Sequence, residues 1–121
     1  MHCIGVDIVE IARLEKAIAR RGEDFLRRVY TDPELRLYRK KLSSLAARFA
    51  AKEAVIKALG KPTTGVSLRE IEILSNPSGK PVVNLYGKAQ HQAQGLGLDK
   101  FAISLSHSRE YAIALVSGET E

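Results

Sequence analysis

Two carboxylates lie in segments of this sequence that otherwise have the composition of a protein core. Asp7 interrupts the β-branched, apolar run HCIGVDIV at residues 2–9, and Glu53 lies within the alanine-rich stretch RFAAKEAVIKA at residues 48–58. Burying an unpaired charge is costly, so each carboxylate is expected to meet a cation. That cation can be a side chain or a metal ion, and the two cases imply different chemistry.

Lys57 follows Glu53 by one helical turn, and an ordinary ion pair at this spacing is common on helices. Taken alone, Glu53 is therefore best explained as the partner of Lys57. The alternative is that Asp7 and Glu53 converge on Mg²⁺, which accepts a few carboxylates and takes its other oxygens from water and phosphate. With Arg48, Lys52 and Lys57 in the same stretch, such a site suits a phosphate-bearing substrate and phosphoryl transfer.

Three further side chains could carry chemistry. His107 ends the alternating segment FAISLSHS, on the same face as its apolar residues. It is either a half-buried histidine bonded to backbone or a site residue at an opening. Cys3 lies in an apolar strand and is expected to be part of the core, whereas His91 lies in a polar helix and is expected to be solvated.

Several familiar site patterns are missing from the sequence. It contains no GxxxxGKS loop, no GxGxxG after a strand, no zinc-type Cys and His spacing and no nucleophile elbow. Four tyrosines and three phenylalanines, with no tryptophan and no RNP-like motif, give little support for stacking on nucleic acid bases. We therefore expect no nucleic acid partner.

The composition fits one domain spanning residues 1–121, because 45% apolar residues can build a small core. A formal net charge of +5 indicates an acidic partner, which charge alone does not identify. The single Cys3 cannot form an internal disulfide, and no segment resembles a secretory signal or is apolar for long enough to span a bilayer. These features predict a cytoplasmic protein with no membrane partner.

The first half of the chain predicts a strand followed by helices. A strand is expected at residues 2–9 and a helix from about residue 10 to 30, with a break at Gly22. The segment TDPE at residues 31–34 has the form of a capping box, with a proline in the first turn, for a helix that continues to about Lys41.

The alanine-rich helix is expected to be the central element. Ser43 or Ser44 is expected to cap its start, and Gly60 to end it. Apolar side chains surround most of its surface, so Glu53 and Lys57 project together from a largely buried cylinder.

The second half of the chain alternates with the period of strands. Residues 69–76 and 80–86 are expected to form a hairpin around NPSGKP, and residues 101–108 and 110–117 a second hairpin. Between them, residues 87–97 form a short helix closed by glycines. The order predicts an α+β fold with a largely antiparallel sheet packed against the alanine-rich helix.

Four motifs in this order resemble those of the holo-(acyl-carrier-protein) synthases, the small bacterial branch of the 4′-phosphopantetheinyl transferases. They are GVDIVEIAR at 5–13, RFAAKEAVIKALG at 48–60, SGKP at 78–81 and SLSHSREYAIA at 104–114. The resemblance covers nearly the whole chain and implies the 4′-phosphopantetheinyl transferase fold. It also implies transfer of the phosphopantetheine arm of coenzyme A to a serine of apo acyl carrier protein, with release of 3′,5′-ADP, for fatty acid biosynthesis.

The resemblance also implies site residues. Asp7 and Glu53 would bind Mg²⁺ and, with Lys57, form the catalytic group, in which Lys57 stabilises or protonates the departing phosphate. Either a metal-bound water or Glu53 could take the serine proton. The residues that the resemblance places around coenzyme A are Arg48, Lys52, Gly60, Gly79, Lys80, Pro81 and His107.

Partners follow from the same resemblance. It implies a homotrimer with active sites between subunits, and an acidic carrier protein docked on Arg13, Arg20 and Arg21, with Phe25 as an apolar contact. A simpler interpretation is that these arginines form a solvated helix face.

Two rival classes make different predictions. A basic RNA-binding module would bind RNA without Mg²⁺ and would leave Asp7 and Glu53 without a role. A metal-dependent phosphohydrolase would use the same carboxylates but would consume coenzyme A with no carrier protein present.

Overall fold

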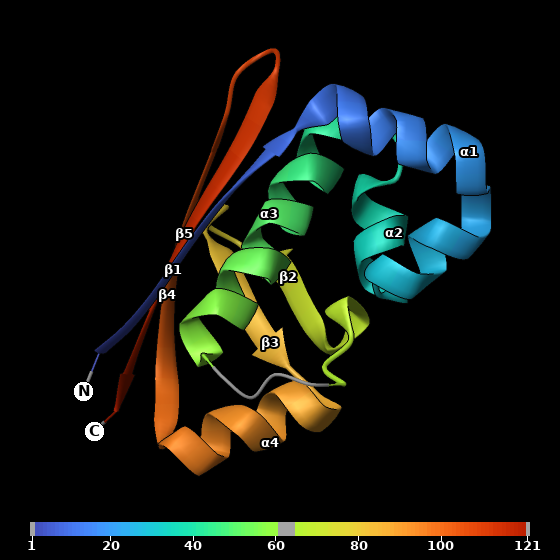
Figure 1. Cartoon of the computed structure of the whole chain (residues 1–121). Coiled ribbons are helices and arrows are strands. Elements are labelled where there is room, and N and C mark those ends of the chain that lie inside the picture. Colours follow the sequence, from blue (N-terminus) through green and yellow to red (C-terminus); the bar gives the residue numbers. More distant parts are fainter. Residues whose placement is uncertain (1, 61–64, 121) are drawn as a thin grey trace.

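A computed structural model of the chain describes residues 2–60 and 65–120. Its elements follow the order strand, helices, hairpin, helix, hairpin (Figure 1). They are β1 (His2–Glu10), α1 (Ile11–Val29), α2 (Asp32–Tyr38), α3 (Leu42–Leu59), the 3₁₀ helix η1 (Leu68–Glu70), β2 (Ile71–Ser75), β3 (Pro81–Leu85), α4 (Gly87–Leu96), β4 (Leu98–His107) and β5 (Tyr111–Thr120).

The strands form two antiparallel sheets, which confirms the expected α+β class. β5 pairs with both β1 and β4 in a three-stranded sheet, and β2 and β3 form a separate two-stranded sheet. Both predicted hairpins are present, but the strands do not form the single sheet that was expected. Helix α4 connects β3 to β4, and the two strands do not join in a ladder.

Helix α3 is the central element of the fold. Figure 1 shows it beside the three-stranded sheet, with α1 and α2 on its other side. The stripe Ala50, Ala54 and Ala58 is almost completely buried. Small side chains let the helix backbone approach β1 closely at Gly5, where an added Cβ would lie 1.8 Å from the Ala54 carbonyl oxygen. The expected buried alanine-rich cylinder is confirmed.

The helix boundaries match the predicted signals in part. The Thr31 hydroxyl accepts from the Glu34 amide, and the Glu34 carboxylate accepts from the Thr31 amide, so the predicted capping box is present. Gly60 ends α3 with φ 71°, and Gly22 interrupts α1 with φ 61° and ψ −140°.

Two boundary predictions were wrong. Helix α2 ends at Tyr38 rather than near Lys41. The N-cap of α3 is Lys41, with no side-chain cap, because the connection from α2 is so short that Ser43 and Ser44 already lie in the first turn.

The outer face of the three-stranded sheet carries large, solvent-exposed apolar side chains. Alternation along β1 and β5 turns Ala112, Ala114 and Val116 inward, where they are fully buried. The exposed set on the other face, called the sheet face below, consists of Ile4, Val6, Ile8, Tyr111, Ile113 and Leu115.

Within residues 2–60 and 65–120, no helix combines the length and the apolar character that crossing a membrane requires.

Candidate functional site

Asp7 and Glu53 lie together where β1 passes α3. Asp7 is on the inward side of β1, with 19% of its side chain exposed, and Glu53 is half-buried on α3. Both line a hollow of about 380 Å³ between β1, α1 and α3. The rest of its wall is mostly apolar and includes Leu14, Phe25 and Phe49. The structure thus brings together two carboxylates that are 46 positions apart in the sequence.

The electrostatics of the pair reflect this proximity. Burial and the neighbouring Asp7 charge raise the pKa of Glu53, and Lys57 partly opposes the shift. A second cation close to both carboxylates would relieve this repulsion.

Lys57 binds Asp7 instead of forming the expected simple pair with Glu53. Its Nζ donates to Asp7 Oδ1 at 2.9 Å and to the Val6 carbonyl at 3.1 Å. The side chain remains 56% exposed, so it can exchange this partner for another anion at little cost.

The donor set suits a hard divalent cation that takes few protein ligands. Among the residues that the structure describes, no group of three or more His, Cys, Asp or Glu side chains could hold a metal ion. Two carboxylates are nevertheless enough for Mg²⁺, which usually keeps several waters and shares phosphate oxygens with its substrate. Asp7 and Glu53 therefore fit such an ion, and the open hollow leaves room for its other ligands.

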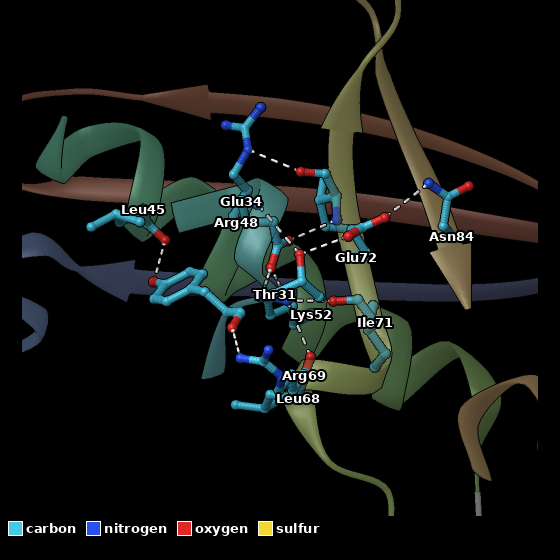
Figure 2. A network of polar contacts seen from close by, with 12 residues as sticks. Thr31, Glu34, Leu45, Arg48, Lys52, Leu68, Arg69, Ile71, Glu72 and Asn84 are labelled. Carbon is cyan, nitrogen blue, oxygen red and sulfur yellow. Dashed lines mark hydrogen bonds and ion pairs between the residues drawn. The ribbon is translucent and has the colours of Figure 1, made fainter. Parts of the chain in front are cut away.

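Lys52 is not part of this site. Its side chain is 0% exposed, and its Nζ donates to Glu34 Oε1 at 2.7 Å, to the Leu68 carbonyl at 3.1 Å and to the Ile71 carbonyl (Figure 2). The expectation that Lys52 binds coenzyme A does not fit this geometry, because the ammonium is enclosed and all three of its N–H donors are used.

Arg48 also faces away from the carboxylates. Only 7% of the residue is exposed, and its guanidinium stacks on the Tyr38 ring with 3.5 Å to the centroid. It donates to the Ile73 carbonyl at 3.1 Å and to the hydroxyl of Ser75 at 3.3 Å. These contacts join α3 to β2 and α2, so the expected contact with coenzyme A does not fit the observed packing either.

The other residues expected around coenzyme A are spread over the surface. Gly60, Gly79 and Lys80 are exposed, and Pro81 begins β3. His107 is exposed at the end of β4, so the half-buried interpretation was wrong. In the described part of the chain, no hydrogen bond or ion pair links these residues to Asp7 or Glu53.

Helix α1 presents the residues expected to meet a carrier protein. Arg13 and Arg20 are exposed, and Arg13 also lines the hollow. Arg21 lies over the Phe25 ring, 5.4 Å from its centroid. Phe25 itself is 8% exposed, and its ring stacks on that of Phe49 with 6.4 Å between the centroids. It therefore forms part of the wall of the hollow and offers little open surface to a partner.

Phe49 and Leu14 were missed as site residues. Both are apolar residues on helices, with no feature that distinguishes them from core positions, and they do pack in the core. Only the contact between α1 and α3 turns them toward the carboxylates, and no local pattern signals that contact.

Comparison with known proteins places this arrangement among enzymes of one kind. The family model described as the 4′-phosphopantetheinyl transferase superfamily matches residues 3–116. A holo-(acyl-carrier-protein) synthase of Dehalococcoides mccartyi strain CBDB1 is 56% identical over 112 residues, which are 93% of each chain.

Solved structures agree. The Helicobacter pylori holo-(acyl-carrier-protein) synthase in complex with coenzyme A superposes with a TM-score of 0.86 at 35% identity, covering 96% of this chain and 99% of that one. The Bacillus anthracis synthase in complex with CoA (3′,5′-ADP) gives a TM-score of 0.79 at 31% identity, covering 98% and 96%.

The raised pKa of Glu53 predicts a specific pH dependence of stability. Because the folded-state pKa lies above the unfolded one, the protonated carboxyl stabilises the fold at low pH, and this contribution is lost as the pH rises through the folded-state pKa. Glu53→Gln does not undergo that loss. It should unfold a few degrees above the wild type at pH 7, with the gap closing toward pH 4.

Thermal unfolding between pH 4 and 8 measures the difference. Glu15→Gln, on an exposed position of α1, is the matched control and should follow the wild type. A Glu53→Gln protein that is no more stable than the wild type at pH 7 would contradict the electrostatic account.

Proposed function

The chain belongs to the 4′-phosphopantetheinyl transferase superfamily, and we propose as its function the transfer of 4′-phosphopantetheine from coenzyme A to a serine of apo acyl carrier protein. The observation that carries this function is the meeting of Asp7, Glu53 and Lys57 beside an open hollow, in a chain whose matched relatives are synthases of this kind.

The reaction exchanges one ester partner of a phosphorus atom. The serine oxygen forms a bond to the phosphorus that carries the pantetheine, the bond to the bridging oxygen of the pyrophosphate breaks, and 3′,5′-ADP leaves with that oxygen. The serine gives up its proton. Negative charge grows on the transferred phosphoryl oxygens and on the leaving phosphate, so catalysis depends mainly on cations and N–H donors placed near them.

Residues of this chain supply that environment. Asp7 and Glu53 would hold Mg²⁺, which when bound neutralises charge on the pyrophosphate. Lys57 lies one turn beyond Glu53, and its exposed ammonium can pass from Asp7 to the departing phosphate. The apolar wall around Phe49 excludes water from one side of the carboxylates.

Dependence on Mg²⁺ is supported by the donor set. In the part of the chain that the structure describes, no His or Cys joins the two half-buried carboxylates in a metal-binding group, which favours a hard oxygen-seeking ion over zinc or copper. The repulsion that raises the pKa of Glu53 would be relieved by a divalent cation between the two groups.

Helix α1 is the proposed docking surface for the carrier protein. Arg13 and Arg20 are seven residues apart and precede the kink at Gly22, so they share one face of a regular helix segment. Arg13 also borders the hollow, which would bring an acidic helix bound here close to Asp7 and Glu53. Arg21 and the edge of Phe25 extend this surface.

The sheet face supports the proposal of a homotrimer. Six large apolar side chains side by side on β1 and β5 are unusual on a monomer and are suited to cover by further copies of the chain. Since β1 carries both the sheet face and Asp7, subunit contacts there would adjoin the active site.

We place the enzyme in fatty acid biosynthesis and, given the free thiol of Cys3, in the cytoplasm.

The transfer reaction can be tested directly by mass spectrometry of apo acyl carrier protein incubated with this protein, coenzyme A and Mg²⁺. The carrier should gain one phosphopantetheine group. Asp7→Asn and Glu53→Gln should lower the rate at least about 100-fold while the protein stays folded, since each removes a metal ligand. Glu15→Gln should transfer normally. Consumption of coenzyme A without a carrier protein would indicate a phosphohydrolase and refute the proposal.

Charge reversal tests the docking surface. The double variant Arg13→Glu and Arg20→Glu should raise the KM for carrier protein about tenfold or more, leave the KM for coenzyme A unchanged and flatten the salt dependence of the rate. Arg36→Glu with Lys40→Glu makes the same change in net charge at other exposed positions and serves as control. If the α1 variant instead loses affinity for coenzyme A, α1 faces the nucleotide.

Sedimentation equilibrium tests the oligomer. The wild type should sediment as a trimer, and Ile113→Lys in the middle of the sheet face should dissociate it and lower the transfer rate. Val82→Lys, on the separate β2–β3 sheet and 37% exposed, is the matched control and should remain trimeric. A fully active wild-type monomer would refute this assembly.

A further inference from the structure

A polar cluster is buried where α2, α3 and β2 meet (Figure 2). Its members, called the buried cluster below, are Thr31, Glu34, Lys52 and Glu72, and they are 8%, 0%, 0% and 5% exposed. The transfer reaction described above uses none of them. A site that buries two carboxylates and an ammonium so completely is costly to form, and apolar residues of the same volume are often as stable or more so.

Lys52 is the member that comes from α3. Its three N–H donors go to Glu34 on α2, to the Leu68 carbonyl of η1 and to the Ile71 carbonyl at the start of β2. Burial lowers the pKa of the Lys52 ammonium, and the Glu34 carboxylate opposes this shift. Since an ammonium has only three donors, the direction of the side chain is fully determined.

The carboxylates fix the other elements to one another. Glu34 Oε1 accepts from the Thr31 amide and Oε2 from the Ile73 amide, each at 2.8 Å. Glu72 accepts from the Thr31 hydroxyl at 2.6 Å and from the Tyr86 hydroxyl at 3.0 Å. The buried cluster thus ties the start of α2 to β2 and to Tyr86, just after β3, and Lys52 ties α3 to the same residues.

Lys52 immediately precedes Glu53 on the helix. Adjacent residues differ by about 100° around the axis, so fixing the direction of Lys52 fixes the direction of Glu53. Arg48, one turn earlier, adds a second bond from α3 to β2 through the Ile73 carbonyl. On the far side of the helix, the close contact at Gly5 and Ala54 sets the distance to β1.

We propose that Lys52, held by Glu34, is a positioning residue that sets the rotation of α3 and so keeps Glu53 in register with Asp7 for binding a divalent cation. This inference rests on the proposed function, because it assigns a role toward the metal site. It also accounts for a buried ion pair at a place where an apolar contact would serve stability equally well.

The test compares variants that keep the volume of the cluster. Lys52→Met leaves the Glu34 carboxylate buried without its cation, and this single variant can fail to fold for that reason. The double variant Lys52→Met with Glu34→Gln removes both charges of the ion pair and decides the question in that case. Val55→Ala is the matched control, because it opens a cavity on the same helix without touching a polar contact.

Two readouts separate positioning from plain stability. Mn²⁺ binding to the purified protein, measured by calorimetry below the unfolding transition of every variant, should weaken about 10- to 100-fold in the double variant and stay near wild type in Val55→Ala. The Mg²⁺ concentration for half-maximal transfer should rise in parallel, and kcat should recover at saturating Mg²⁺.

Wild-type Mn²⁺ affinity in a folded double variant would overturn the inference, as would an equal loss in Val55→Ala. Either result leaves the proposed function intact as long as the wild type transfers phosphopantetheine. Absence of both Mn²⁺ binding and transfer in the wild type would instead refute the proposed function.

Discussion

The close approach of α3 to β1 is the constraint on which the rest of the structure depends. Gly5 carries no side chain at the point where the Ala54 carbonyl meets the strand, and any larger residue would clash with backbone. This contact brings the half-buried Asp7 and Glu53 to one wall of a hollow. Without it, the two carboxylates would have no common site, and Lys57 could not reach Asp7.

Helix α3 separates its charges by direction. Arg48 and Lys52 point toward β2 and α2, where they are enclosed and bonded to carbonyl and carboxylate oxygens. Glu53 lines the hollow, and Lys57, one turn later, reaches Asp7 with an exposed side chain that can exchange partners. One helix thus carries a rigid side that fixes it in the fold and a reactive side whose charges are only partly compensated. Active sites commonly hold such uncompensated charge at some cost in stability.

Local signals in the sequence predicted the elements well. The capping box at Thr31 and Glu34, the stop at Gly60 and both hairpins are short-range patterns, and the structure contains each of them. The prediction that Asp7 and Glu53 converge followed from the resemblance and from the need to compensate two carboxylates. The structure brings these two side chains to the same hollow.

Long-range partners could not be read from the sequence. Lys52 and Lys57 are the same residue type in one helix, yet Lys52 pairs with Glu34, 18 positions earlier, and Lys57 with Asp7, 50 positions earlier. Both partners were identified from the sequence, Glu34 as part of a capping box and Asp7 as a carboxylate that needs a cation. The choice between them depends on how α2 and β1 pack around α3, which no local pattern encodes. The division of the strands into two sheets was missed for the same reason.

The central claim is that Asp7 and Glu53 jointly bind the divalent cation that serves the transfer reaction. Crystals grown with coenzyme A and Mn²⁺, with diffraction data collected at the manganese absorption edge, test it most directly. The account predicts one anomalous peak within coordinating distance of both carboxylates and of a pyrophosphate oxygen, with Lys57 moved from Asp7 to the phosphate. A manganese ion bound elsewhere, or bound without Glu53 while Lys57 still pairs with Asp7, would contradict it.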